Sequence, residues 1–182
     1  TAGATGVPKG AMLSHANLAA AGATTVDAFE ATPRDDIFSY LPMCHAVERV
    51  CSSAAALTAG STVNFGEGAE SFTLDIAEVQ PTIFLGVPSV WEQAAATVSS
   101  RIASTGSVQR VAYNFWTERG SKSAKRRQKG GGPGLTGRLG SLGLYRSLRK
   151  KLGMQRVRVA VSTGAAVDQQ ALDFFWSIGV PV

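Results

Sequence analysis

Along the 182-residue chain, short apolar runs alternate with longer segments in which apolar residues recur at helical spacing. Ser14 is a favourable N-cap, and Leu13 and Leu18 flank it in the hydrophobic-staple arrangement, which predicts a helix over residues 14–30. Further helices are expected at 44–59, at 72–79, from Pro88 onward and after Asp168. The expected strands are 9–13, 37–41, 61–65, 82–85, 157–161 and a last one after Gly179.

Helices and strands that alternate at these lengths predict a parallel sheet. Two parallel strands need a crossover of about a dozen residues, usually a helix, and the chain repeats strand, helix and strand. Pro33, Pro42 and Pro81 end successive elements, and Gly60 follows the second expected helix as its C-terminal cap. We therefore expect an α/β fold with βαβ units around a mainly parallel sheet.

Positive charge is concentrated in one segment of the chain. Most of the Lys and Arg residues lie between Arg110 and Arg158, opposed only by Glu118, so the net charge of +5 reflects this segment and not the rest of the chain. Residues 121–134 combine Lys, Arg, Ser and Gly, a composition that cannot form a packed element. A helical apolar stripe, weakened by glycines, follows at Leu135, Leu139, Leu142, Tyr145, Leu148 and Leu152.

The composition is that of a globular protein. Apolar residues make up 45% and charged residues 17% of the chain, and no uninterrupted apolar run is long enough to span a membrane. The chain begins without Met and stops at residues 180–182, where a strand is expected to start, so we expect it to be a fragment. For the same reason, the lack of a signal peptide is uninformative.

The two cysteines, Cys44 and Cys51, are expected to be reduced thiols. They lie on one expected helix, two turns from each other, which is too far for a disulfide. Their spacing with His45 matches no zinc pattern. Free thiols of this kind are typical of a reducing compartment.

The segment TAGATGVPKG at residues 1–10 combines several potential anion-binding groups. Its glycines permit positive φ and turn several N–H groups toward one anion, while Lys9 adds a point charge and Thr1 and Thr5 add hydroxyl donors. It is not a Walker A loop, which has Gly directly before the Lys and Ser or Thr directly after it. The segment is either a phosphate loop of another kind or a glycine-rich surface hairpin without a ligand.

This loop resembles the T-S-G-T-T-G-x-P-K-G signature of the adenylate-forming acyl- and aryl-CoA synthetases, the AMP-dependent synthetase and ligase family. Ala2 and Ala4 stand where that family usually has hydroxyl residues. The resemblance implies that the loop holds the phosphates of ATP, with Thr5 and Lys9 making the dominant contact. The phosphate-binding residues that it implies are Thr1, Gly3, Thr5, Gly6 and Lys9.

Three further stretches resemble the same family in the right order. YLPMCH at residues 40–45 is similar to a strand-end motif in which the His borders the acyl-adenylate, a role that would fall on His45. The ERV that follows at 48–50 looks most like the long-chain fatty acid branch.

The other two stretches would supply the acyl and adenine sites. PTIFLGVPSVWE at 81–92 resembles the strand and turn beside the acyl pocket, and STGAA at 162–166 resembles the Gly-Ala loop that lies against adenine, with Val167 in place of the usual Pro. The implied pocket residues are His45, Gly86, Val87 and Pro88, and the implied adenine residues are Gly164, Ala165 and Ala166.

The physical chemistry of these residues agrees with those roles. All three stretches lie at the carboxyl ends of expected strands, where ligands of open α/β sheets collect. Gly164 and its small neighbours permit a flat base to approach the backbone. A neutral His45 is able to donate to a phosphate or carboxylate oxygen; without the surrounding motif it would be interpreted as a hydrogen-bonded histidine at a helix start.

The resemblance implies a two-step ligase reaction with Thr5, Lys9 and His45 as catalytic residues. A fatty acid carboxylate attacks the α-phosphate of ATP to give acyl-AMP and pyrophosphate, and the thiol of coenzyme A (CoA) then displaces AMP. Both reactants of the first step are anions, so charge neutralisation and in-line positioning matter more than a strong base. Mg2+ would bridge phosphate oxygens, and its Glu ligand is expected beyond Val182.

We therefore expect a central fragment of a long-chain fatty acid-CoA ligase. Residues 1–182 would form part of an acyl-CoA synthetase-like N-terminal (adenylation) domain, with a flexible basic insertion at about 119–152 and without the C-terminal domain. The fragment alone would be inactive. A fatty acyl-AMP ligase or another adenylating enzyme stays open, as does a non-catalytic module that binds an anion or a membrane.

The basic insertion has two interpretations. It is a solvated, flexible insertion, or it is an electrostatic contact with anionic lipid that the leucines at 139, 142 and 148 support. Nucleic acid is not an expected partner, because the basic run has no interleaved aromatic residues and matches no binding motif. The expected location is the cytoplasm, with peripheral membrane contact under the second interpretation.

Overall fold

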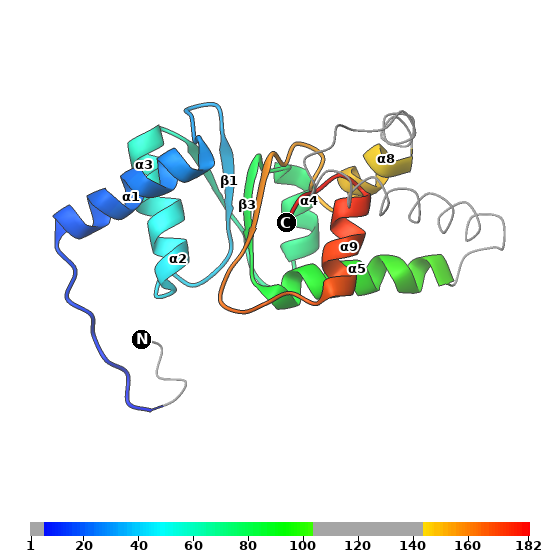
Figure 1. The fold of residues 1–182 in the computed structure, drawn as a ribbon, viewed down its shortest axis with the longest axis horizontal. Helices are drawn as coiled ribbons and strands as arrows, with labels where there is room; N and C mark the ends of the chain where they lie inside the picture. Colours follow the sequence, from blue (N-terminus) through cyan, green and yellow to red (C-terminus); the bar gives the residue numbers. More distant parts are fainter. Residues whose placement is uncertain (1–5, 104–143) are drawn as a thin grey trace. The chain divides into compact units, whose positions relative to one another are not determined.

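The computed structural model describes residues 6–103 and 144–182 (Figure 1). The chain divides into two compact units, Thr1–Phe84 and Leu85–Val182, and the boundary falls inside a strand. The expectation of a flexible insertion at about 119–152 lies mostly outside the described residues.

The first unit alternates helices and strands as the sequence predicts. Its elements are α1 (His15–Phe29), β1 (Asp36–Ser39), α2 (Ala46–Arg49), the π-helix η1 (Val50–Ala55), α3 (Ala56–Ala59), β2 (Thr62–Phe65), α4 (Phe72–Val79) and the start of β3 (Ile83–Gly86). The second unit contains the end of β3, α5 (Pro88–Ala103), α8 (Leu144–Lys151), β4 (Val159–Ser162) and α9 (Gln169–Ser177).

The strands form one four-stranded sheet in the order β2-β1-β3-β4. β1 pairs in parallel with β2 from Asp36 opposite Thr62 onward, and in parallel with β3 through Ile37 opposite Ile83. In the second unit, the backbone N–H of Thr163 donates to the carbonyl of Gly86 (3.2 Å), just past the end of β4. The predicted α/β class with a mainly parallel sheet is confirmed.

An aromatic cluster fills the core of the first unit. Tyr40 stacks on Phe38 and on Phe84, with ring centroids 5.9 Å apart in both pairs, and meets the ring of Phe72 edge-on at 4.9 Å. Phe38 and Phe84 are almost fully buried. Because Phe72 begins α4, the cluster holds this helix against β1 and β3.

A buried carboxylate fixes the amino ends of β1 and β3. Asp35 accepts hydrogen bonds from the backbone N–H of Thr32 (2.8 Å) and from the hydroxyl of Thr82 (2.6 Å), and it is 3% exposed. Thr82 in turn accepts from the backbone N–H of Asp36 (3.0 Å). A charged group this deeply buried needs such partners, so this network stabilises the start of both strands.

A T-shaped aromatic pair lies at the core of the second unit. Trp91 on α5 and Phe175 on α9 have no exposed surface, and their ring centroids lie 4.9 Å apart at 81°. The expected cap of α9 is present, because the Asp168 carboxylate accepts from the backbone N–H of Gln170 (2.9 Å). Gly179 follows α9 with a φ of +84°, as expected for a residue that ends a helix.

Two of the expected strands are wrong. Residues 9–13 have no regular structure, Met12 is 99% exposed, and no described strand lies beside them to accept their hydrogen bonds. Residues 180–182 also form no strand. In both segments the apolar composition alone suggested a strand, but a strand forms only where a neighbour pairs with it.

The helix expected at 44–59 needs two corrections. It begins at Ala46, so the exposed Cys44 precedes it and shares no helix with the buried Cys51. Its middle part is the π-helix η1, which sequence periodicity does not reveal. Gly60, with a φ of +70°, ends it as predicted.

Candidate functional site

His45 lies in the turn that leads from β1 into α2. Its backbone N–H donates to the carbonyl of Pro42 (2.8 Å), and its own carbonyl accepts from Arg49 (3.0 Å), so His45 is the N-cap residue of α2. The side chain is half-buried and makes no capping hydrogen bond. Its Nδ1 atom is buried without a hydrogen-bond partner, which buried polar atoms rarely tolerate. This nitrogen is therefore available to a ligand or to a group outside the described residues.

Glu48 is a buried carboxylate next to this turn. It is 6% exposed, and it accepts hydrogen bonds from the backbone N–H of Leu41 (3.3 Å) and from the hydroxyl of Ser52. Burial, together with the negative charge of Glu48, raises the pKa of the Cys51 thiol to about 11. No role of its own was predicted for Glu48. Its position three residues after the N-cap was the available signal, because Glu there often reaches back to backbone N–H groups.

The ends of β3 and β4 bring two of the predicted stretches together in the second unit. The hydrogen bond from Thr163 to Gly86 joins the implied acyl-pocket residues 86–88 to the implied adenine loop 162–166. A Cβ atom on Gly86 would lie 2.4 Å from Nε1 of Trp91, so no larger residue fits there without displacing the indole. Val87 is half-buried, and Pro88 opens α5 as predicted.

The implied adenine loop is open to solvent. Gly164, Ala165 and Ala166 are exposed, Gly164 has a φ of +95°, and no atom lies within 4 Å of the place where its Cβ would be. The Oγ atom of Ser162, at the end of β4, is buried and has no hydrogen-bond partner. The loop therefore offers a bare backbone face with an unsatisfied hydroxyl beside it.

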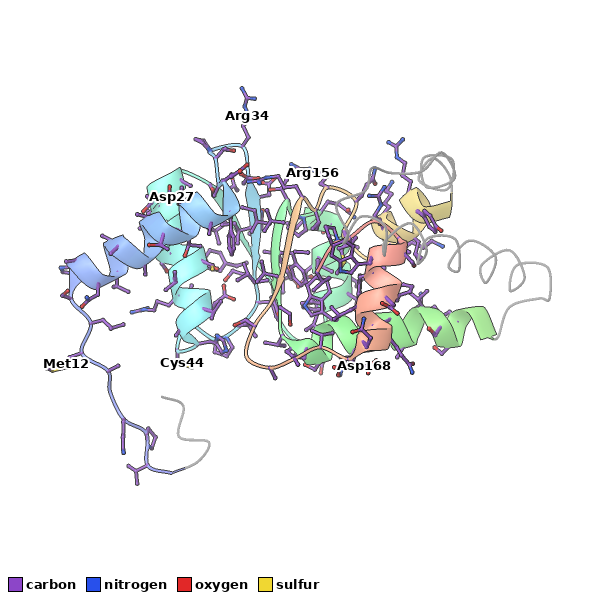
Figure 2. All side chains as sticks on the ribbon, viewed as in Figure 1. Met12, Asp27, Arg34, Cys44, Arg156 and Asp168 are labelled. Carbon is purple, nitrogen blue, oxygen red and sulfur yellow. The ribbon has the colours of Figure 1, made fainter. Side chains whose placement is uncertain are left out.

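A side chain of α5 holds the far end of this loop. Oε1 of Glu92 accepts from the backbone N–H of Asp168 (3.1 Å), and Asp168 itself caps α9. Figure 2 shows Asp168 at the start of α9. The loop is thus tied at Thr163 to β3 and at Asp168 to α5, which fixes both ends of the exposed segment between them.

The implied phosphate loop is only partly described. Thr1, Gly3 and Thr5 lie outside the described residues, so the roles implied for them stay predictions. Gly6 and Lys9 are exposed and lie in a segment without regular structure. Lys9 and His45 belong to the first unit, and residues 86–88 and 162–166 belong to the second. Within the second unit, the hydrogen bond from Thr163 to Gly86 brings these two stretches together.

The described residues also bear on metal binding and on membrane insertion. Among residues 6–103 and 144–182, no three His, Cys, Asp or Glu side chains group together in a way that would hold a metal ion. In the same part of the chain, no helix has both the length and the apolar character needed to cross a bilayer.

Comparisons with known proteins point to one family. The profile described as AMP-binding enzyme matches residues 1–182. The chain is 30% identical over 190 residues to the long-chain-fatty-acid–CoA ligase ACSBG2 of Xenopus laevis and 32% identical over 190 residues to that of Gallus gallus. These matches cover 100% of this chain, and 26% and 25% of the two relatives.

A fungal relative shows the same extent of match. The long-chain-fatty-acid–CoA ligase 1 of Schizosaccharomyces pombe is 28% identical over 194 residues, which cover 100% of this chain and 27% of the relative. The chain thus spans about a quarter of the length of these relatives. No solved structure gives a significant match. Because the family profile matches the whole sequence, the chain belongs to the AMP-binding enzyme family.

Proposed function

We propose that the protein containing this chain is an ATP-dependent long-chain fatty acid-CoA ligase. The observation that carries the proposal is the hydrogen bond from Thr163 to Gly86, which ties an open, glycine-containing loop to the carboxyl end of β3. Ligands of open α/β sheets bind at this edge. The names of the relatives, which are long-chain-fatty-acid–CoA ligases, favour a fatty acid as the acid that is activated.

In this proposal, the residues bind and orient two anionic reactants. Thr5 and Lys9, with Thr1, Gly3 and Gly6, hold the β- and γ-phosphates of ATP, and the backbone at Gly164, Ala165 and Ala166 lies against adenine. His45 donates to an oxygen of the acyl phosphate, while Gly86, Val87 and Pro88 line the acyl pocket. Holding the reactants close and neutralising their charge lowers the barrier to carboxylate attack on the α-phosphate.

Mg2+ and CoA complete the proposed reaction. Because the described residues contain no cluster of metal-ligating side chains, we assign no Mg2+ ligand and no metal-dependent step to them. CoA would act as the co-substrate that accepts the acyl group from AMP. Nothing in residues 6–103 and 144–182 distinguishes CoA from another acceptor, so a fatty acyl-AMP ligase is the alternative outcome of the test.

The test is pyrophosphate release by the full-length protein, measured over a series of fatty acid chain lengths. We expect release that depends on a long-chain acid and ATP, and acyl-CoA as the product when CoA is added. Acyl-AMP that accumulates even with CoA present would identify the fatty acyl-AMP ligase. No pyrophosphate release with any acid would contradict the proposed function and favour a non-catalytic binding module.

The same pyrophosphate-release assay tests the proposed role of Lys9. We expect Lys9→Ala to raise the KM for ATP about 10-fold or more, because a charge-assisted contact to phosphate is removed. Lys151→Ala is the matched control: this lysine is also exposed, and it belongs to the end of α8 and not to the predicted loop. An unchanged KM for ATP in Lys9→Ala would remove Lys9 from the proposed phosphate site.

We further propose that the basic segment contacts anionic membrane lipids, and that the protein works in the cytoplasm. Support for the contact comes from α8, where Arg146, Lys150 and Lys151 are exposed. Support for the compartment comes from the two free cysteines. Co-sedimentation of the full-length protein with phosphatidylserine vesicles, reduced by deleting residues 122–129, is the expected result. Equal sedimentation of both forms would contradict the contact.

A further inference from the structure

Glu48 has two hydrogen-bond donors, and neither comes from a cation. One carboxylate oxygen accepts from the backbone N–H of Leu41 (3.3 Å), and the other accepts from the hydroxyl of Ser52. Within the part of the chain that the structure describes, no Lys or Arg forms an ion pair with Glu48. A carboxylate that is 6% exposed would be costly to bury without these donors, so both bonds contribute to its stability.

The bond to Leu41 closes the turn that carries His45. Leu41 lies just after the end of β1, and Glu48 lies in the first turn of α2. In a capping box, the residue at the position of Glu48 would reach the N–H of the N-cap, but here the N–H of His45 already donates to Pro42. Glu48 instead reaches further back, to the strand end, and so ties both sides of the turn together.

Among the described residues, two hydrogen bonds hold the turn at residues 41–45. Pro42, Met43 and Cys44 are exposed, so packing contributes little to its conformation. Its fixed points are the bond from His45 to Pro42 and the bond from Leu41 to Glu48. The position of the imidazole therefore depends on whether the carboxylate of Glu48 stays in place.

The π-helix supplies the second anchor of Glu48. Ser52 is a buried residue of η1, one helical turn after Glu48, and its hydroxyl donates to the carboxylate. A π-helical segment changes the directions in which its side chains point, and such segments are frequent at functional sites. Ser52 holds the carboxylate from the helix side, which leaves its other oxygen for the strand end.

We propose that Glu48 is a positioning residue that sets the place of His45 for adenylate formation, a role that rests on the proposed ligase function. Its two oxygens accept hydrogen bonds within the protein, from Leu41 and from Ser52. It acts through the backbone of the turn between β1 and α2. Loss of the carboxylate frees the turn, and His45 then no longer meets the acyl phosphate in a reactive geometry.

A double-mutant cycle in the full-length protein tests this role. We expect Glu48→Ala to lower kcat for pyrophosphate release by about 10- to 100-fold with the KM for ATP nearly unchanged, because a displaced group slows chemistry more than nucleotide binding. Glu48→Gln should restore most of kcat, because its amide accepts from Leu41 and donates to Ser52. Glu78→Ala, which removes an exposed carboxylate of α4, is the control and should leave kcat unchanged.

The decisive result is the effect of Glu48→Ala in a His45→Ala background. If Glu48 acts through His45, adding Glu48→Ala to the His45→Ala variant lowers kcat further by less than about threefold. The proposal is overturned if the double variant loses kcat by the full product of the two single effects. An unchanged kcat in Glu48→Ala alone would also overturn it. Should Glu48→Ala fail to fold, Ser52→Ala releases the same carboxylate from one anchor and enters the same cycle, with the same criteria.

Hydrogen exchange separates this inference from the proposed function. Peptides that cover residues 38–49 should exchange faster in Glu48→Ala and at the wild-type rate in Glu48→Gln. If the wild-type protein releases no pyrophosphate but the exchange changes as expected, the proposed function fails and the structural link stands. If the wild-type protein is active and the exchange is unchanged in Glu48→Ala, the link itself is wrong.

Discussion

Cys51 shows how a neighbouring charge and burial change the chemistry of one side chain. Its thiol is 6% exposed, and burial with the charge of Glu48 raises its pKa to about 11. Since the thiolate is the reactive form, Cys51 is nearly inert at neutral pH. Cys44, seven residues earlier, is exposed. The two thiols of this chain should therefore differ strongly in reactivity.

We predict that a thiol reagent at pH 8 labels Cys44 and leaves Cys51 unmodified in the folded protein. Peptide mapping by mass spectrometry measures both sites in one sample. Addition of denaturant is the control, because unfolding exposes Cys51 and should make the two sites react alike. Equal labelling of both sites without denaturant would contradict the burial of Cys51.

The raised pKa of Cys51 also predicts a dependence of stability on pH. Between about pH 9 and 11 the unfolded chain loses the thiol proton while the folded state keeps it, so the free energy of unfolding falls as pH rises through this window. The loss is on the order of 2 kcal/mol. Urea unfolding at pH 8 and pH 10.5 measures it, and Cys51→Ala should lose less stability than wild type between these two values.

Residue types predicted some of these local features and missed others. Ser14 and Asp168 were recognisable as caps because a cap depends on a few adjacent residues, and both accept the expected backbone hydrogen bonds. The reciprocal bond, which the backbone N–H of Ser14 donates to Oδ1 of Asn17, was not foreseen. The role of Glu48 was missed because its partner Leu41 lies across a turn whose path only the folded chain defines.

At the scale of elements, close helix packing depends on Gly22. α1 packs against η1 and α3, and a Cβ atom on Gly22 would lie 2.8 Å from the backbone carbon and oxygen of Ala54. Backbone atoms cannot move aside as the end of a flexible side chain can. α1 and η1 are therefore held at a separation that only glycine permits at position 22.

Gly22→Ala should destabilise the protein by about 1–3 kcal/mol, because overpacking outweighs the better helix propensity of alanine. Gly68→Ala is the matched control, since nothing lies within 4 Å of its Cβ position, and its effect should stay within about 0.5 kcal/mol. Urea unfolding monitored by circular dichroism gives both values. Equal effects of the two substitutions would show that α1 and η1 do not pack this closely.

Sequence periodicity predicted helices well where a segment was amphipathic or was followed by a proline or glycine that ends a helix. α1 and α4 begin and end within a residue of the predicted bounds. The strand expected at 9–13 failed because pairing, not composition, makes a strand. The π-helical middle of the second helix also escaped prediction, because its side-chain pattern does not differ enough from that of an α-helix.

At the scale of the whole molecule, the residues with proposed roles belong to two separate compact units. The first contains Lys9, His45 and Glu48, and the second contains the joined ends of β3 and β4. The chain also spans only about a quarter of the length of its ligase relatives. The proposed ligase reaction is therefore tested in the full-length protein.

We predict that residues 1–182 alone bind ATP weakly and form no acyl-AMP, because the expected Mg2+ ligand and the expected C-terminal domain lie outside them. The measurement is pyrophosphate release with a long-chain fatty acid, ATP and Mg2+, and the full-length protein is the positive control. Acyl-AMP formed by residues 1–182 at a rate near that of the full-length protein would contradict this prediction.

The sequence by itself determined the α/β class, the helix caps and the membership of the AMP-binding enzyme family. These features rest on short-range periodicity, on adjacent residues and on motifs that are continuous in the chain. The tertiary structure decided that β1 pairs with both β2 and β3, that Thr163 meets Gly86, and that Glu48 holds the turn before His45. Such contacts depend on how separate segments pack and on which donors burial leaves available, and no local pattern contains that information.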